Sequence, residues 1–306
     1  MNIKIRQNYG QIFRELRESK NLSLFQVSGE HFSSAQLSRF ELQVSDFTFS
    51  KLLHSLDTIR VTPEEFATII RGYKLSDLEE FAKTCEEYYI KQDIPAIKKL
   101  YQKEIELADK KNASLFHELN AISIQALICN LDKTFSVSYK DKKKLSNYLL
   151  GASTWGIYEM LLFINSINIF ETELIVLLTK EIVAKTNFYH SIPRHKEIIF
   201  NILINVSNTC LNRNELKYAE FFLETINQFP LEENNLQQRN CLLYTKGIYK
   251  IKTGKVEEGK RLVESSISIL EQLECNNTKN LYESHYKEIL AYIYIHSKTK
   301  SVENHA

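Results

Sequence analysis

The chain has 306 residues, enough for one small and one larger domain, each with its own core. Its 39 lysines and arginines nearly balance 38 aspartates and glutamates, so no overall field draws the chain to nucleic acid, and such binding must rest on a local surface. With only 8 glycines and 4 prolines, the composition predicts an all-α protein.

The first 70 residues carry the periodicity of five short helices. Ser23, Ser33 and Thr62 stand where helix N-caps are expected, and Pro63 follows Thr62 at a first helical position. The helical segments are Tyr9–Lys20, Leu24–Glu30, His31–Glu41, Phe49–Ile59 and a helix from Thr62. Five short helices with a tight turn between the second and the third are typical of the phage-repressor helix-turn-helix unit, which we place in residues 1–68.

The third of these helices has the pattern of a DNA recognition helix. Leu37 and Phe40 are spaced to bury one face, which leaves short polar side chains, one glutamine and one arginine facing outward. Such a set suits a major groove, where glutamine pairs with adenine and arginine with guanine or phosphate. The residues that we expect to contact DNA are Arg14, Arg17, Ser33, Ser34, Ala35, Gln36, Ser38 and Arg39. The alternative is a helical bundle that makes no DNA contact.

A second region follows a linker at residues 69–76 and extends over residues 77–300. Two helical hairpins in it share a weak pattern of small, turn and apolar positions at a period of 40 residues. The matching positions are Ser207, Asn214, Ala219, Leu223 and Ile226, and then Gly247, Gly254, Gly259, Val263 and Ser266. The pattern predicts an α-solenoid of degenerate tetratricopeptide-like repeats with a concave inner surface.

Four asparagines form a stripe on one predicted helix of this region. Asn201, Asn205, Asn208 and Asn212 follow one another at i, i+4, i+7 and i+11. Asparagine is a poor helix former, but its short amide both donates and accepts, so such a stripe could hold the backbone of an extended peptide. The alternative is an ordinary solvated face.

Other residues of this region allow two readings. Asn165 is a weaker candidate for peptide binding, and Arg194 with His195 could meet a ligand carboxylate or be ordinary surface charges. The aromatic group around Trp155 and Tyr158 could belong to the core or to a pocket.

Two segments carry a family resemblance. Ser23–Glu41, which ends in SSAQLSRFE, resembles the helix-turn-helix of the Rgg family of bacterial regulators, which reads EHLSxSQISRFE at this point. Trp155–Asn165 is similar to the WGxYExxLFxN segment of the same family. The chain departs from the pattern at Leu24, where many such domains have glutamine, and at Gln43, where relatives have glycine.

The resemblance implies a helix-turn-helix domain followed by a repeat domain that senses a short, apolar signalling peptide used in quorum sensing. It also implies a homodimer formed partly by the C-terminal helices and a peptide held through its backbone by asparagines. We therefore expect a transcriptional regulator that binds promoter DNA. A protein-binding adaptor, or a DNA-binding regulator that senses a small molecule or partner protein, remains as an alternative.

Nothing in the sequence points to an enzyme or to a cofactor. The phosphate-binding, dinucleotide-binding, nucleophile-elbow and zinc-protease motifs are missing, and histidines and cysteines do not cluster at metal-ligand spacing. Five widely spaced cysteines without a CxxC pair are typical of reduced thiols in the cytoplasm. The apolar runs are far short of the roughly 20 residues that cross a bilayer, and the start does not resemble a signal peptide, so we expect a cytoplasmic protein without a membrane partner.

Overall fold

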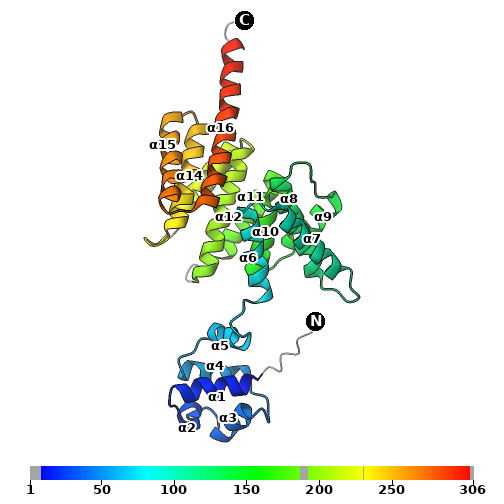
Figure 1. Ribbon diagram of the computed structural model, residues 1–306, viewed down its shortest axis with the longest axis vertical. Coiled ribbons are helices and arrows are strands. Elements are labelled where there is room, and N and C mark those ends of the chain that lie inside the picture. Colours follow the sequence, from blue (N-terminus) through cyan, green and yellow to red (C-terminus); the bar gives the residue numbers. More distant parts are fainter. Residues whose placement is uncertain (1–7, 187–191, 230, 304–306) are drawn as a thin grey trace. The chain divides into compact units, whose positions relative to one another are not determined.

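The computed structural model describes residues 8–186, 192–229 and 231–303. Within these ranges the chain forms α-helices, numbered α1 to α16, and one short 3-10 helix, without a β-strand (Figure 1). The all-α prediction is confirmed. The contacts divide the chain into two compact units, Met1–Lys83 and Thr84–Ala306, which are described separately.

The N-terminal unit contains the five predicted short helices around a small apolar core. They are α1 (Tyr9–Ser19), α2 (Leu24–Ser28), α3 (Ser34–Glu41), α4 (Phe49–Thr58) and α5 (Pro63–Ile70). Phe13, Val27 and Leu37 are fully buried in this core, and the rings of Phe40 and Phe47 stack with their centroids 4.8 Å apart. The helices that are too short to be stable alone are thus held by one shared core.

The predicted N-caps explain where three of these helices begin. The Ser23 hydroxyl accepts from the backbone N–H of Gln26 at 3.2 Å, and the Gln26 side chain accepts from the Ser23 N–H at 2.8 Å. This reciprocal pair is a capping box. Thr62 accepts from the N–H of Glu65 at 3.1 Å, directly before Pro63. Each such cap stabilises its helix by about 1 kcal/mol.

The division between the units lies later in the chain than the predicted linker at residues 69–76, because it falls inside α6 (Asp77–Ile90). Ser76 directly precedes this helix, and its N–H and hydroxyl both donate to the Glu79 carboxylate at 2.9 and 2.6 Å. The Arg71 side chain donates to the carbonyl of Lys74 at 3.1 Å, and its guanidinium lies 3.9 Å from Glu79. These contacts hold the first turn of α6 to the segment that precedes it.

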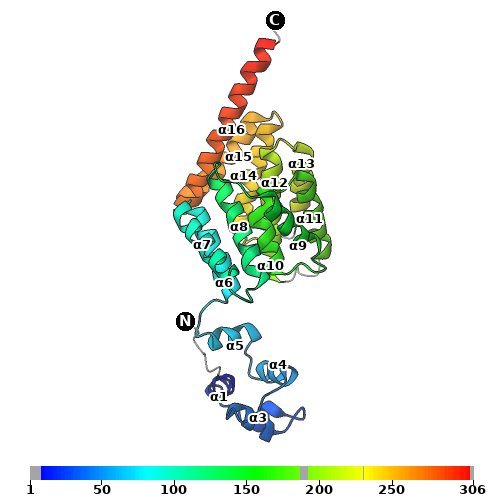
Figure 2. The same ribbon diagram turned by 90° about the vertical axis from the view of Figure 1, so that its right-hand side faces the viewer.

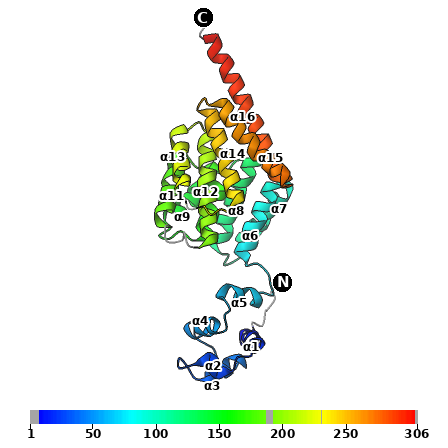
Figure 3. The same cartoon turned by 90° about the vertical axis from the view of Figure 1, so that its left-hand side faces the viewer.

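The second unit is a double layer of helices (Figures 2 and 3). Its further elements are α7 (Ile94–Ala108), α8 (Leu115–Leu131), α9 (Tyr139–Leu150), α10 (Ile157–Ser166), the 3-10 helix Ile167–Ile169, α11 (Thr172–Lys185), α12 (Pro193–Asn212), α13 (Leu216–Asn227), α14 (Leu236–Lys252), α15 (Val256–Gln272) and α16 (Asn276–Glu303). Helices α8, α10, α12 and α14 pack side by side in chain order, and the partners α7, α11, α13 and α15 pack against members of that row. Alternate helices thus form one layer, as in a helical-repeat protein.

The small-residue pattern marks where paired helices come closest. A Cβ on Gly247 would lie 2.9 Å from the carbonyl oxygen of Gly259, and one on Gly259 would lie 2.5 Å from that of Gly247, so α14 and α15 touch through their backbones. The turns after α12 and α14 have positive φ, 62° at Asn214 and 91° at Gly254. Ser207 and Ala219, at the equivalent positions one hairpin earlier, are fully buried. The predicted pattern thus has a direct packing explanation.

The aromatic group around Trp155 belongs to the core. Trp155 and Phe163 are fully buried and meet edge to face with their centroids 6.1 Å apart. Phe170 is also buried, and Tyr158 is half-buried with its hydroxyl donating to the Asn120 side-chain oxygen at 3.0 Å. The core interpretation of these residues is therefore favoured over a pocket.

Candidate DNA-binding and ligand-binding surfaces

Helix α3 presents the surface predicted to meet DNA. Its N-cap Ser33 accepts a hydrogen bond from the N–H of Gln36 at 3.3 Å, which fixes where the helix begins. Leu37 and Phe40 are buried in the core of the N-terminal unit, as their spacing predicts. The opposite side of the helix is therefore turned outward.

The outward side chains of α3 differ in how they are held. Ala35 and Arg39 are exposed, and the Arg39 Nε lies 3.4 Å from the carbonyl oxygen of Ala35 in the same helix. Ser34 and Ser38 are half-buried, and the Ser34 hydroxyl lies 2.9 Å from that of Ser28 in α2. Arg39 is thus the cation of α3 that can reach a base edge or a phosphate.

Gln36 has a neighbour that the sequence reasoning missed. Lys51, in the first turn of α4, donates from Nζ to the Gln36 Oε1 at 3.1 Å. This contact leaves the Gln36 amide nitrogen as a donor and places a second positive charge beside the predicted base contact. A lysine at the start of the helix after the recognition helix was the available signal.

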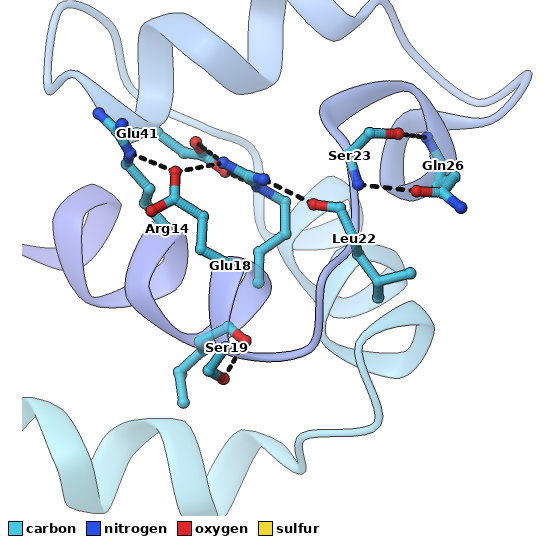
Figure 4. Close-up of polar contacts among 9 residues, drawn as sticks. Arg14, Glu18, Ser19, Leu22, Ser23, Gln26 and Glu41 are labelled. Carbon is cyan, nitrogen blue, oxygen red and sulfur yellow. Dashed lines mark hydrogen bonds and ion pairs between the residues drawn. The ribbon is translucent and has the colours of Figure 1, made fainter.

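Arg17 does not lie on this surface, contrary to the prediction that it contacts DNA. Its side chain is only 8% exposed and forms a bidentate ion pair with Glu41, whose side chain is 4% exposed, at 2.7 Å from Nε and 2.8 Å from Nη2. Nη1 donates to the carbonyl of Leu22 at 2.6 Å (Figure 4). The hydrogen bond to Glu41 is the main cause that raises the pKa of Arg17. The guanidinium therefore ties α1 to the end of α3 and is buried away from the exposed surface of that helix.

Arg14 is exposed, unlike Arg17, and stays in the candidate set. Its Nε donates to the Glu18 carboxylate at 2.7 Å, one turn later in α1 (Figure 4). This hydrogen bond is the main cause that raises the pKa of Arg14 and lowers the pKa of Glu18. Because exposed pairs of this kind are weak, the side chain is able to exchange Glu18 for a phosphate.

The ends of α3 are set by two backbone features. At Gly10, α1 lies so close to α3 that a Cβ would sit 1.9 Å from the carbonyl oxygen of Phe40. Gln43, the departure from the family pattern, takes the left-handed conformation that glycine favours, with φ 58°, and the N–H of Val44 donates to the Arg39 carbonyl at 2.8 Å. The helix ends as it would with glycine, at the cost of a strained glutamine.

The four asparagines, which we call the asparagine stripe, lie on one face of α12. This helix runs between α10 and α14 and packs on α13 in the other layer. Leu203, Ser207 and Cys210 are buried on the side of α12 that belongs to the repeat pattern. At 3.6 residues per turn the asparagines lie on the opposite side, facing away from the second layer.

Three asparagines of the stripe have side-chain polar atoms without a hydrogen-bond partner among the described residues. Asn201 is half-buried and Asn205 exposed, and neither side chain has a hydrogen-bond partner within the described ranges. The Asn208 Oδ1 is buried without a partner among the described residues. An unpaired buried amide oxygen costs about 1–3 kcal/mol, so a better-paired state of this face would be favoured.

The fourth asparagine is already engaged. The Oδ1 of Asn212 lies 2.9 Å from the Nε2 of His285 in α16. Asn165, near the end of α10, is half-buried, and its side chain makes no hydrogen bond within the described part of the chain. Asn212 therefore differs from the other candidates, because its acceptor is occupied.

Charged residues gather at the first turns of α12. Arg194 is exposed, and its charge, after burial, contributes to lowering the pKa of His195. Glu197, on the same face as the stripe, lies 3.5 Å from the amide nitrogen of Gln238 in α14. Burial first, and then Glu197, raises the pKa of Glu86 in α6. The N-terminal end of the stripe thus carries both signs of charge.

The WGxYE segment acts as the start of α10. The Glu159 carboxylate accepts from the Gly156 N–H at 3.1 Å and from the Tyr148 hydroxyl at 2.8 Å. Burial is the first cause, and Glu159 the next, that raises the pKa of Tyr148 to about 12. The segment thereby fixes the start of α10 against α9.

A comparison with protein-family models decides the family. Residues 98–284, more than half of the chain, match the model of the C-terminal domain of the HTH-type transcriptional regulator Rgg. The chain belongs to the Rgg family. Rgg proteins are transcriptional regulators and not enzymes, as the sequence predicted.

Solved structures share the fold of this Rgg protein over almost its whole length. The SHP pheromone receptor Rgg2 of Streptococcus dysgalactiae is 24% identical with a TM-score of 0.75, covering 92% of this chain and 98% of its own. A transcriptional regulator from Listeria monocytogenes is 24% identical with a TM-score of 0.79, covering 94% and 99%. The complex of PrgX with cCF10 is 14% identical with a TM-score of 0.66, covering 93% and 92%. The predicted combination of a helix-turn-helix with a helical-repeat domain is confirmed.

None of the described helices combines the length and the apolar character that a bilayer crossing requires. Histidines, cysteines and carboxylates do not form a group that could hold a metal ion in the described ranges.

Proposed function

We propose that this Rgg protein binds promoter DNA through α3 and that a short, apolar signalling peptide on the asparagine stripe controls its activity. The observation that carries the peptide proposal is the row of amides on α12 that lack partners. Support comes from relatives whose names describe them as a pheromone receptor and as a pheromone complex. In a cell the DNA would place this regulator in the cytoplasm.

On DNA, Arg39 would contact guanine or phosphate, and Gln36 with Lys51 beside it would contact a neighbouring base. Ser33, Ala35 and Ser38 would line the same groove, with Arg14 on a phosphate. The net charge of +1 supplies little non-specific attraction, so we propose a homodimer that places two α3 helices in successive major grooves.

On the peptide side, Asn201, Asn205 and Asn208 would each pair with backbone groups of an extended chain. Amides one turn apart lie about 5–6 Å from each other, close to the spacing of alternate residues in an extended peptide. Asn165 and Arg194 would contribute at the edges. A peptide that prefers one state of the dimer by about 1.4 kcal/mol would shift the balance between states tenfold.

The DNA proposal is tested by selecting random 30-base-pair duplexes on the full-length chain and measuring affinity against salt. We expect Arg39→Ala to weaken binding by about 1–3 kcal/mol and, if the contact is a phosphate, to lower the salt slope by about one. Arg261→Ala, the same charge change on exposed α15, is the control and should leave affinity unchanged. An adaptor would show no salt-dependent retention of any duplex.

The peptide proposal is tested by calorimetry with a set of synthetic apolar peptides, each also assayed for its effect on DNA binding. We expect Asn205→Ala to weaken any peptide that binds by about tenfold, the loss of about 1.4 kcal/mol of hydrogen bonding. Asn227→Ala, an exposed asparagine at the end of α13, is the matched control. Equal peptide affinities for both variants and the parent would contradict the assignment of the stripe.

A further inference from the structure

The C-terminal end of the asparagine stripe is closed by a side chain from α16. The His285 ring stands between two partners, with Nδ1 2.9 Å from the Tyr244 hydroxyl and Nε2 2.9 Å from the Asn212 Oδ1. We infer that His285 is a latch that competes with a ligand for Asn212, so that occupancy of the stripe is coupled to the docking of α16. This inference rests on the proposed peptide function.

The contact joins three helices that are far apart in sequence. Asn212 ends α12, Tyr244 lies in the middle of α14, and His285 is in α16. The Tyr244 and Tyr282 rings are 3.9 Å apart between centroids, and the Tyr282 hydroxyl donates to the Cys241 sulfur at 3.1 Å. The same stretch of α16 therefore packs on α14 through rings and reaches α12 through the imidazole.

The available donors and acceptors indicate which ring nitrogen of His285 carries the proton. A neutral ring with its proton on Nε2 donates to the Asn212 Oδ1. The single proton of the Tyr244 hydroxyl is then shared between the unprotonated Nδ1 at 2.9 Å and the carbonyl oxygen of Tyr282 at 3.0 Å. Burial lowers the pKa of His285, and the charge of Lys252 acts in the same direction against that of Glu288. The neutral ring is thus the favoured form near pH 7, and in it the Asn212 oxygen is the acceptor that the ring requires.

The geometry of a helix sets how long a ligand can be before it meets the latch. From Asn201 to Asn208 the stripe rises about 10 Å, and to Asn212 about 16 Å, at 1.5 Å per residue. An extended peptide advances about 3.3 Å per residue, so about three residues pair with the first three amides and about five reach the fourth. A longer occupant has to take the Asn212 oxygen from His285, and α16 then loses its bond to α12.

The latch is tested without a ligand, by histidine NMR titration of the full chain, with the His285 signal assigned from His285→Gln. In Asn212→Asp a carboxylate replaces the amide at the same place, and the proton affinity of His285 should rise about tenfold or more. In Asn205→Asp, the same change two turns earlier and exposed, His285 should titrate as in the parent. Equal titration in all three proteins would overturn the inference.

Hydrogen exchange of α16 supplies the second measurement. Asn212→Ala removes the acceptor as a ligand would, and it should speed amide exchange in residues 276–291 about as much as His285→Gln, with no further gain in the double variant. Asn205→Ala should leave this exchange unchanged. Unaltered exchange in Asn212→Ala would show that the bond does not hold α16. Because neither measurement uses a peptide, failure of the peptide proposal in calorimetry remains a separate result.

Discussion

Removing one partner of the Arg17–Glu41 ion pair should strongly destabilise the N-terminal unit. Both side chains are more than nine-tenths buried, and each atom pair lies within 2.8 Å. Leaving one such charge unpaired costs about 3–5 kcal/mol. At about 0.05–0.15 kcal/mol per residue, a unit of this size has about 4–12 kcal/mol in all. Glu41→Ala should therefore consume a large part of its stability.

Replacing both charges tests whether the cost comes from the orphaned partner. In Arg17→Met with Glu41→Leu no buried charge remains, so the double variant should lose about 1–2 kcal/mol, mainly the donor to the Leu22 carbonyl. Each single variant should lose more than the double. Arg14→Ala, which removes an exposed pair on the same helix, is the control and should leave unfolding unchanged.

The chain contains its own reference signal for this assay. Trp155 is its single tryptophan and is buried in the second unit, Thr84–Ala306, which we call the repeat unit. Its emission therefore reports the folding of that unit alone. Far-UV circular dichroism in urea reports both units. We expect Glu41→Ala to shift only the dichroism transition of the N-terminal helices. A single variant as stable as the parent, or a double variant as unstable as the singles, would refute the reasoning.

Three other changes have defined outcomes. Gln43→Gly should stabilise the N-terminal unit by about 1 kcal/mol, because φ is 58° there, and the dichroism midpoint in urea should rise while Trp155 emission stays unchanged. Gly247→Ala should destabilise the repeat unit by about 1–3 kcal/mol, since its Cβ would lie 2.7 Å from the Val263 Cγ2; an unchanged Trp155 midpoint would contradict that approach. Burial lowers the pKa of His285 below its ordinary value of 6.5. Below about pH 6.5 the unfolded chain therefore binds a proton at this residue that the folded chain does not bind, and the free energy of unfolding decreases. Between about pH 7.5 and about pH 5.5, the melting temperature of His285→Gln should drop less than that of the parent protein. An equal drop in both proteins would exclude His285 as the cause.

Sequence reasoning succeeded where a structural cause is local. The caps at Ser23 and Ser33 depend on residues three positions away, and the burial of Leu37 depends on helical periodicity. The close approach of Gly247 and Gly259 was visible as a repeated spacing.

It was wrong, or incomplete, where the partner is distant in sequence. Arg17 was predicted to contact DNA because its charge is visible in the sequence but its partner, 24 residues away, is not. The contact of His285 with Asn212 spans 73 residues and left no periodic signal. Lys51 beside Gln36 is the intermediate case, because the two residues lie on consecutive helices and only 15 positions apart.

The attachment of α3 to α1 has a consequence for how a signal could reach DNA. The backbone contact at Gly10 and the ion pair of Arg17 with Glu41 make these two helices one rigid body. Tilting α3 inside its own domain would break a buried charge pair. Under the proposed function, a bound peptide would therefore move whole domains and leave α3 fixed within its own domain. Such a movement would change the effective concentration of one DNA-binding domain near its half-site when the other domain is already bound.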